Sequence, residues 1–123
     1  MSSYRDLEMK VIEWAEARKI IPNSYPLAQT RKTAEETTEL VEAAAKLRLL
    51  DQLKDHLPPE VYEGNREIIL DEFKDAVGDV MVTLVNACAL ADVDAVDCLA
   101  GAYDEIKDRT GTLMEDGTFV KDQ

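Results

Sequence analysis

Positive charge is scarce in this sequence. Its 123 residues include 14 lysines and arginines against 26 aspartates and glutamates, and the formal net charge at pH 7 is −12. A protein that binds the nucleic-acid backbone needs clustered lysine and arginine to neutralise the phosphates, so we expect no nucleic-acid partner. A small polyphosphate is compatible with this charge, because it can arrive with its own Mg²⁺.

Long apolar runs, histidine and cysteine are scarce too. No apolar run reaches the roughly 20 residues of a membrane-spanning helix, and no signal sequence opens the chain, so we expect no membrane partner. The only histidine, His56, lies in a polar segment, where a single imidazole is a poor metal site. Cys88 and Cys98 stand in apolar helical patterns, which favours free core thiols and a reducing cytoplasm. The length fits one domain over residues 1–123.

A first group of acidic residues lies on a helix predicted from Thr33 to Lys46. Thr33 and Glu36 have the spacing of a capping box. Glu39 is three residues from Glu36 and four from Glu35, so the three carboxylates share one surface of the helix. Like charges placed in this way repel each other, and a hard cation such as Mg²⁺ would reverse the sign of the interaction.

A second group lies on a helix predicted from about Ile68 to Ala91. Glu72, Asp75 and Asp79 follow one helical line, which continues to Asn86, and an apolar stripe runs beside it. Acidic residues on helices usually form a solvated face. Here they border an apolar run, where an unpaired charge is costly. Two such helices packed together could surround a metal ion.

With these residues the chain resembles the MazG-like nucleotide pyrophosphohydrolases, an all-α family with Glu-Glu-x-x-Glu on one helix and Glu-x-x-Asp on the next. The two motifs and the segment after them read here Glu35-Glu36-Thr37-Thr38-Glu39, Glu72-Phe73-Lys74-Asp75 and Ala76-Val77-Gly78-Asp79. The last segment is similar to a phage and bacterial subgroup of the family. The resemblance extends from about Trp14 to Lys121.

The second motif departs from the family pattern. In many relatives the final aspartate directly precedes the apolar run, which makes it Asp79, but Ala76 stands where the glutamate is expected. Either Glu72 and Asp75 form the pair, or Asp79 is the conventional ligand and Asp75 or Glu72 replaces the missing glutamate. Both alternatives remain open at this point.

The resemblance implies a four-helix MazG-like bundle with a small C-terminal hairpin, assembled as a homodimer or homotetramer. It implies Mg²⁺-dependent hydrolysis of a nucleoside triphosphate to the monophosphate and pyrophosphate, with Mn²⁺ as the alternative cation. The implied metal ligands are Glu36, Glu39, Glu72, Asp75 and Asp79. Glu35 would orient or deprotonate water, unless it is a ligand itself.

Residues outside the acidic groups complete the expected site. Lys32, Lys107 and Arg109 would contact phosphate, and Asn86 the sugar or base, while Gln29 is a further substrate-binding candidate. Lys32 has an equal alternative as an ion-pair partner of Glu35 or Glu36. Trp14, a candidate wall for a nucleobase, has the alternative of packing in the core or an interface, as tryptophans on apolar stripes usually do.

The remaining segments are read from periodicity and turn signals. The pattern predicts a first helix over Tyr4–Ile20 that ends before Pro22, and a last helix over Ala95–Arg109 capped by the Asp92–Asp94 turn. Pro58-Pro59 and Gly64-Asn65 predict an irregular connection over Leu50–Glu67, either a mobile flap or a plain linker. Asp116-Gly117 between short apolar pieces predicts a hairpin.

Other functions remain compatible with the sequence. Two belong to the same superfamily, namely dUTP hydrolysis and phosphoribosyl-ATP pyrophosphohydrolysis. Two others are non-catalytic: an acidic helical module that binds a protein partner, and a metal-binding regulatory module without turnover.

Overall fold

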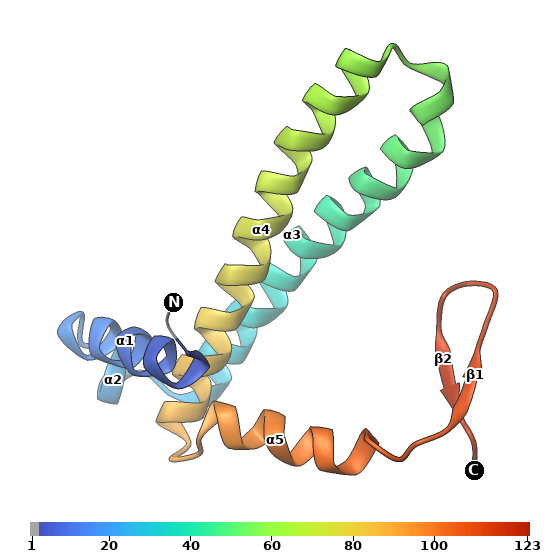
Figure 1. Cartoon of the computed structure of the whole chain (residues 1–123). Coiled ribbons are helices and arrows are strands. Elements are labelled where there is room, and N and C mark those ends of the chain that lie inside the picture. Colours follow the sequence, from blue (N-terminus) through green and yellow to red (C-terminus); the bar gives the residue numbers. More distant parts are fainter. Residues whose placement is uncertain (1–2) are drawn as a thin grey trace.

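The computed structural model describes residues 3–123. Their secondary structure is mostly helical and ends in two short strands (Figure 1). The elements are α1 (Tyr4–Ala17), α2 (Ile20–Asn23), α3 (Pro26–Leu53), a 3₁₀ turn (Lys54–His56), α4 (Pro59–Leu90), α5 (Ala95–Ile106), β1 (Gly111–Leu113) and β2 (Phe119–Lys121). The predicted all-α class with a C-terminal hairpin is confirmed.

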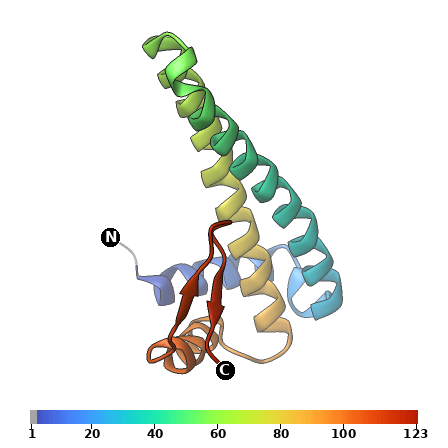
Figure 2. The same cartoon turned by 90° about the vertical axis from the view of Figure 1, so that its right-hand side faces the viewer.

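The two longest helices, α3 and α4, form an antiparallel hairpin and lie side by side in both views (Figures 1 and 2). Small residues mark their contact, since Ala43 is 3% and Ala76 is 4% exposed. Nearer the open end of the hairpin, the Thr33 and Thr83 hydroxyls share a hydrogen bond of 2.8 Å. Near the tip, the Tyr62 hydroxyl donates to Asp51 over 2.8 Å.

The other helices lie at the open end of this hairpin. Helix α1 crosses it there, and α5 leaves α4 at a bend of 102° (Figure 1). Ala95 donates its backbone N–H to the buried Glu8 carboxylate over 3.0 Å, and Arg5 pairs with both Glu8 and Asp94. These contacts tie the start of α5 to α1. The described chain therefore forms a two-helix hairpin with crossing helices, and not four helices side by side.

The start of the first acidic helix differs from the prediction. Helix α3 begins at Pro26, after Tyr25 in extended conformation, because proline at the first helical position needs no hydrogen-bond acceptor for its nitrogen. Thr33 is therefore not an N-cap, and its hydroxyl donates to the Gln29 carbonyl over 3.0 Å. The capping-box prediction was wrong, while the helical assignment of the acidic residues is confirmed.

The prediction of an irregular segment over Leu50–Glu67 was also wrong. Helix α3 continues to Leu53, and α4 already begins at Pro59. Pro59 occupies a first-turn position, where proline starts a helix instead of breaking it. Gly64 and Asn65 lie inside α4, and the Asn65 amide donates to the Val61 carbonyl over 2.8 Å. No flap is present among residues 50–67.

The last helix and the hairpin follow the local signals more closely. Asp94 caps α5 by accepting a hydrogen bond of 3.0 Å from the Asp97 N–H, as predicted, although α5 ends at Ile106 and not at Arg109. Strands β1 and β2 pair antiparallel, with Leu113 opposite Phe119. Gly117 has φ of +90°, a conformation that favours glycine, which confirms the predicted turn.

The core is small for a chain of this length. Among residues 3–123, no large side chain is fully buried, and the buried apolar residues are Ala15, Ala43, Leu50, Tyr62, Ala76 and Ala87. Trp14 is 43% exposed and therefore not a core residue of the described chain. Cys88 is half-buried, but Cys98 is exposed, so the expectation of two core thiols holds only in part.

Over 3–123, no single helix combines the length and the apolar character of a membrane span; only α4 and α5 taken together, across their 102° bend, meet that criterion.

Gly78, inside α4, lies where the surface of the helix is open. Nothing lies within 4 Å of the position that a Cβ would occupy there. We expect Gly78→Ala to raise the free energy of unfolding by about 1 kcal/mol, because glycine costs about that much relative to alanine in a helix interior. Urea titration followed by circular dichroism measures the change. Gly64→Ala, equally open and on the same helix, is the matched control. A loss of stability at Gly78 alone would reveal a backbone or ligand packed against it.

Candidate metal centre

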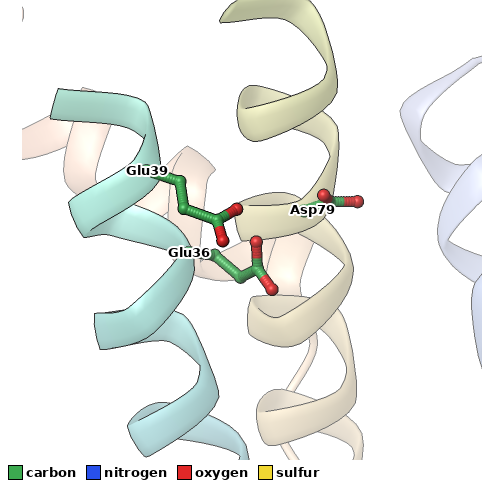
Figure 3. A group of neighbouring side chains, drawn as sticks. All are labelled: Glu36, Glu39 and Asp79. Atoms are coloured by element: carbon green, nitrogen blue, oxygen red, sulfur yellow. The ribbon is translucent and has the colours of Figure 1, made fainter. Parts of the chain in front are cut away.

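Three carboxylates from two helices converge near the middle of the α3–α4 hairpin. Glu36 and Glu39 come from α3, and Asp79 comes from α4 (Figure 3). Each offers one oxygen, and these three atoms lie within 4.8 Å of one another. The Thr33–Thr83 hydrogen bond lies about one turn to one side, and the buried Ala43 and Ala76 lie about one turn to the other. The close helix contact on both sides brings the carboxylates together.

Glu36 is the most enclosed member of this cluster. Its side chain is 12% exposed, and its Oε1 lies 3.4 Å from the Lys32 ammonium. Its Oε2 is buried and has no hydrogen-bond partner among the described residues. A buried carboxylate oxygen without a partner is costly. A bound cation would satisfy it, whereas the carboxylates of a solvated helix face are satisfied by water.

Within the cluster, Glu39 is the carboxylate whose pKa is shifted. Its pKa is raised, first because its protonated form hydrogen-bonds to Glu36, and further by the negative charge of Glu36, by partial desolvation and by the charge of Asp79. The nearby Lys32 opposes this shift. The negative charges of Glu36 and Asp79 therefore disfavour the ionised form of Glu39, and a cation bound among the three carboxylates would remove this repulsion.

A groove of about 340 Å³ extends from the cluster along both helices. It is lined by Glu39, Glu42, Ala43, Lys46, Glu72, Asp75, Ala76 and Asp79. Lys46 donates to Glu72 across the groove over 3.0 Å. Glu42 and Lys46 were missed in the sequence, although Glu42 follows Glu39 by three residues and Lys46 follows Glu42 by four, which places them on the same helical line.

The three acidic residues of α4 do not occupy equivalent places. Only Asp79 belongs to the close cluster, while Asp75 and Glu72 line the groove further along. Glu72 and Asp79 are separated by about 10 Å of helical rise, and Glu72 is paired with Lys46. This arrangement favours the alternative in which Asp79 is the conventional ligand.

Lys32 and Glu35 lie together at the edge of the cluster. The Lys32 ammonium is 3.3 Å from Glu35 and 3.4 Å from Glu36, and its pKa is raised chiefly by the hydrogen bond to Glu35. The ion-pair alternative for Lys32 is thus present in the structure. Glu35 is 70% exposed and outside the three-carboxylate cluster.

The other expected substrate-binding residues, Trp14, Gln29 and Asn86, do not line the groove. The Arg18 guanidinium covers the Trp14 ring at 4.6 Å, and the Gln29 amide donates to the Ser24 hydroxyl over 3.1 Å. Asn86 is 3% exposed, and its Oδ1 has no partner in the described part of the chain.

The two other residues expected to contact phosphate, Lys107 and Arg109, lie beyond the bend between α4 and α5. Lys107 is the C-cap residue directly after α5, its ammonium is 3.6 Å from Asp104, and Arg109 follows before β1. This end of α5 points away from the α3–α4 hairpin (Figure 1). Within one chain, the structure therefore does not bring Lys107 and Arg109 to the carboxylate cluster.

Comparison with protein-family models, curated proteins and solved structures finds no match for this chain. The interpretation of the site consequently depends on its own geometry and chemistry.

Metal binding predicts a specific thermal stabilisation. A cation that binds only the folded state must raise the melting temperature by mass action. We expect Mg²⁺ or Mn²⁺ to raise it well beyond an ionic-strength-matched sodium control, and Asp79→Asn to lose most of that difference. Glu13→Gln, which makes the same change in charge on α1, should keep it. Equal shifts with Mg²⁺ and sodium would mean that salt only screens the net charge.

The raised pKa of Glu39 predicts how metal-free stability depends on pH. Between the ordinary carboxyl pKa of 4.5 and the raised value, the folded state binds more protons than the unfolded state. This contribution to stability is therefore present at low pH and is lost as pH rises through the raised pKa. We expect Glu39→Gln to remove it, so that the variant in EDTA at neutral pH is as stable as wild type or slightly more stable. Urea unfolding across pH measures this, with Glu13→Gln as control. A marked loss of stability in Glu39→Gln would instead assign Glu39 a structural role.

Proposed function

We propose that this chain is a MazG-like, Mg²⁺-dependent nucleoside triphosphate pyrophosphohydrolase, which cleaves between the α- and β-phosphates to give a nucleoside monophosphate and pyrophosphate. The observation that carries the proposal is the convergence of Glu36, Glu39 and Asp79 within 4.8 Å at a groove lined by further carboxylates. The motif resemblance supports the choice of reaction, and the geometry supports the choice of cation.

The donor set fits a hard divalent cation. All three groups offer oxygen ligands, which Mg²⁺ and Mn²⁺ prefer. The unpartnered Glu36 Oε2 and the raised pKa of Glu39 both indicate negative charge that lacks compensation. Glu36, Glu39 and Asp79 would hold the ion, with Asp75 and Glu72 further along the groove. Bound there, Mg²⁺ would neutralise phosphate oxygens and stabilise the charge that develops during in-line attack.

The groove offers positions for the rest of the reaction. Its volume of about 340 Å³ is within the range of small-ligand sites. Lys46 lines it about two turns along α3 from Glu39 and could exchange Glu72 for a phosphate oxygen. Lys32 could do the same from the other side by releasing Glu35, and Glu35 would then be free to orient or deprotonate water.

The enclosed Glu36 carboxylate favours this proposal over a solvated acidic face. A module that only displays negative charge to a protein partner gains nothing from a carboxylate that is 12% exposed with one oxygen unpartnered. Hydrolysis of dUTP or of phosphoribosyl-ATP would use the same metal chemistry, and a substrate panel separates these reactions.

Product analysis tests the reaction class. Incubation with a mixture of nucleoside triphosphates and Mg²⁺ should release pyrophosphate and the matching monophosphate, because attack at the α-phosphorus leaves the β- and γ-phosphates joined. Ion-exchange chromatography identifies the products, and EDTA should abolish them. Diphosphate with orthophosphate would indicate a phosphatase, and no product from any nucleotide would favour a binding module.

A substitution series tests which acidic residues matter. We expect Glu36→Gln and Asp79→Asn each to lower kcat/KM by at least about 100-fold, since each removes electrostatic stabilisation at the reacting phosphates. Glu72→Gln should cost less, because Glu72 lies outside the close cluster and pairs with Lys46. Activity across a Mg²⁺ titration measures these effects, with Glu13→Gln as the charge-matched control. Equal severity for Glu72→Gln and Asp79→Asn would contradict this ranking and point to a second metal position.

A further inference from the structure

The two cysteines of the chain lie on either side of the bend between α4 and α5 (Figure 1). Cys88 is in the last turn of α4, and Cys98 is in the first turn of α5. Backbone hydrogen bonds hold the bend at both ends. The Val93 N–H donates to the Cys88 carbonyl over 2.9 Å, and the Cys98 N–H donates to the Asp94 carbonyl over 3.0 Å. The backbone therefore fixes the positions from which the two cysteine side chains start.

Helix α1 packs against both α4 and α5 at this bend. The buried Glu8 carboxylate of α1 accepts a hydrogen bond of 3.0 Å from the Ala95 N–H and pairs with Arg5 over 2.8 Å. The negative charges of Glu8 and Asp94 also reach the Cys88 thiol. Three helices thus meet where the cysteines lie.

The two thiols are neighbours with unequal access to solvent. Burial raises the pKa of the Cys88 thiol, and direct interaction with the Cys98 side chain raises it further. Cys88 is half-buried, whereas Cys98 is exposed. An exposed thiol meets a reagent from solution first, and a shielded thiol beside it is placed to react second.

We propose that Cys88 and Cys98 are a redox-active pair, which a low-molecular-weight disulfide oxidises to an intramolecular disulfide that clamps the α4–α5 bend. The Cys98 thiolate attacks one sulfur of a disulfide such as oxidised glutathione, and the first glutathione leaves and takes up a proton. The Cys88 sulfur then loses its proton and attacks the Cys98 sulfur of the mixed disulfide, which releases the second glutathione. Two protein thiols are oxidised to one disulfide, and one glutathione disulfide is reduced to two thiols.

The disulfide would act on the direction of α5. In the reduced chain, α5 is held at its start by hydrogen bonds and by the Arg5–Asp94 ion pair, all of which are reversible. A covalent bridge between the last turn of α4 and the first turn of α5 closes a short loop around the bend and restricts the angle between the helices. This inference does not depend on the proposed hydrolase activity.

Mass spectrometry of the full chain tests whether the pair forms. Wild type is equilibrated with reduced and oxidised glutathione, and the remaining thiols are blocked with N-ethylmaleimide. We expect the mass of one chain less two hydrogen atoms. A proteinase that cleaves before aspartate cuts between the cysteines, at Asp92 and Asp94, and the two fragments should stay joined until they are reduced. The internal disulfide should exceed the mixed disulfide at least about 10-fold, because the neighbouring thiol has the higher effective concentration.

Cys88→Ser and Cys98→Ser are the matched variants, since each leaves one thiol. We expect Cys88→Ser to accumulate the mixed disulfide on Cys98. Cys98→Ser should react with oxidised glutathione at least about 10-fold more slowly, because the remaining Cys88 thiol is half-buried and its pKa is raised. Equal rates for the two variants would overturn the proposed order of attack.

Hydrogen exchange on oxidised and reduced wild type tests the clamp and needs no variant. Amides of residues 91–98 should exchange at least about 10-fold more slowly in the oxidised chain, while those at the centre of the α3–α4 hairpin should not change. A wild type that stops at the mixed disulfide, disulfides that form only between two chains, or equal exchange over residues 91–98 in both forms would each overturn the proposal.

Discussion

The site depends on the close contact between α3 and α4. Ala43 and Ala76 allow the two helices to approach, and the Thr33–Thr83 hydrogen bond of 2.8 Å holds them on the other side of the cluster. A larger residue at either alanine would force the helices apart, since packed interiors have little room to absorb extra volume. Asp79 would then move away from Glu36 and Glu39, and the carboxylate cluster would be lost without any change in its own residues.

That contact forces together charges that repel one another. Without a cation, part of the repulsion is relieved because the pKa of Glu39 is raised, so that this carboxyl takes up a proton more readily, and part because Lys32 lies beside Glu36. Both effects are reversible, because a proton can dissociate from Glu39 and the exposed Lys32 side chain can pair with another anion. A site arranged in this way is held in place by the helices and not by its own charges. It therefore remains available to a cation and to a phosphate.

Local signals in the sequence predicted much of this structure, and the failures have a common physical cause. Asp94 and Gly117 act within a few residues of themselves, so their cap and turn were predictable. Pro59 was misread because proline both stops one helix and starts another, and only the packing of α4 on α3 decides between these roles. Whether Asp79 or Glu72 lies beside Glu36 and Glu39 depends on how α3 and α4 are aligned. The periodicity of each helix taken separately does not give this alignment. The spacing of three and four residues that places Glu36 and Glu39 on one surface also predicts Glu42 and Lys46 there, but both residues lie outside the Glu-Glu-x-x-Glu motif.

The sparse core and the carboxylate cluster of Glu36, Glu39 and Asp79 have the same origin. On α4, the buried residues include Ala76, Thr83 and Asn86, all on or beside the helical line that carries Asp79. Small and polar residues on this line let the carboxylates approach, but they bury little apolar area, and the hydrophobic stabilisation of the chain falls in proportion. The larger apolar side chains are left on outer surfaces, those of α5, β1 and β2 among them, where nothing in the described chain covers them. A chain that uses its inner helix contact to build a charged site must gain its hydrophobic stabilisation elsewhere.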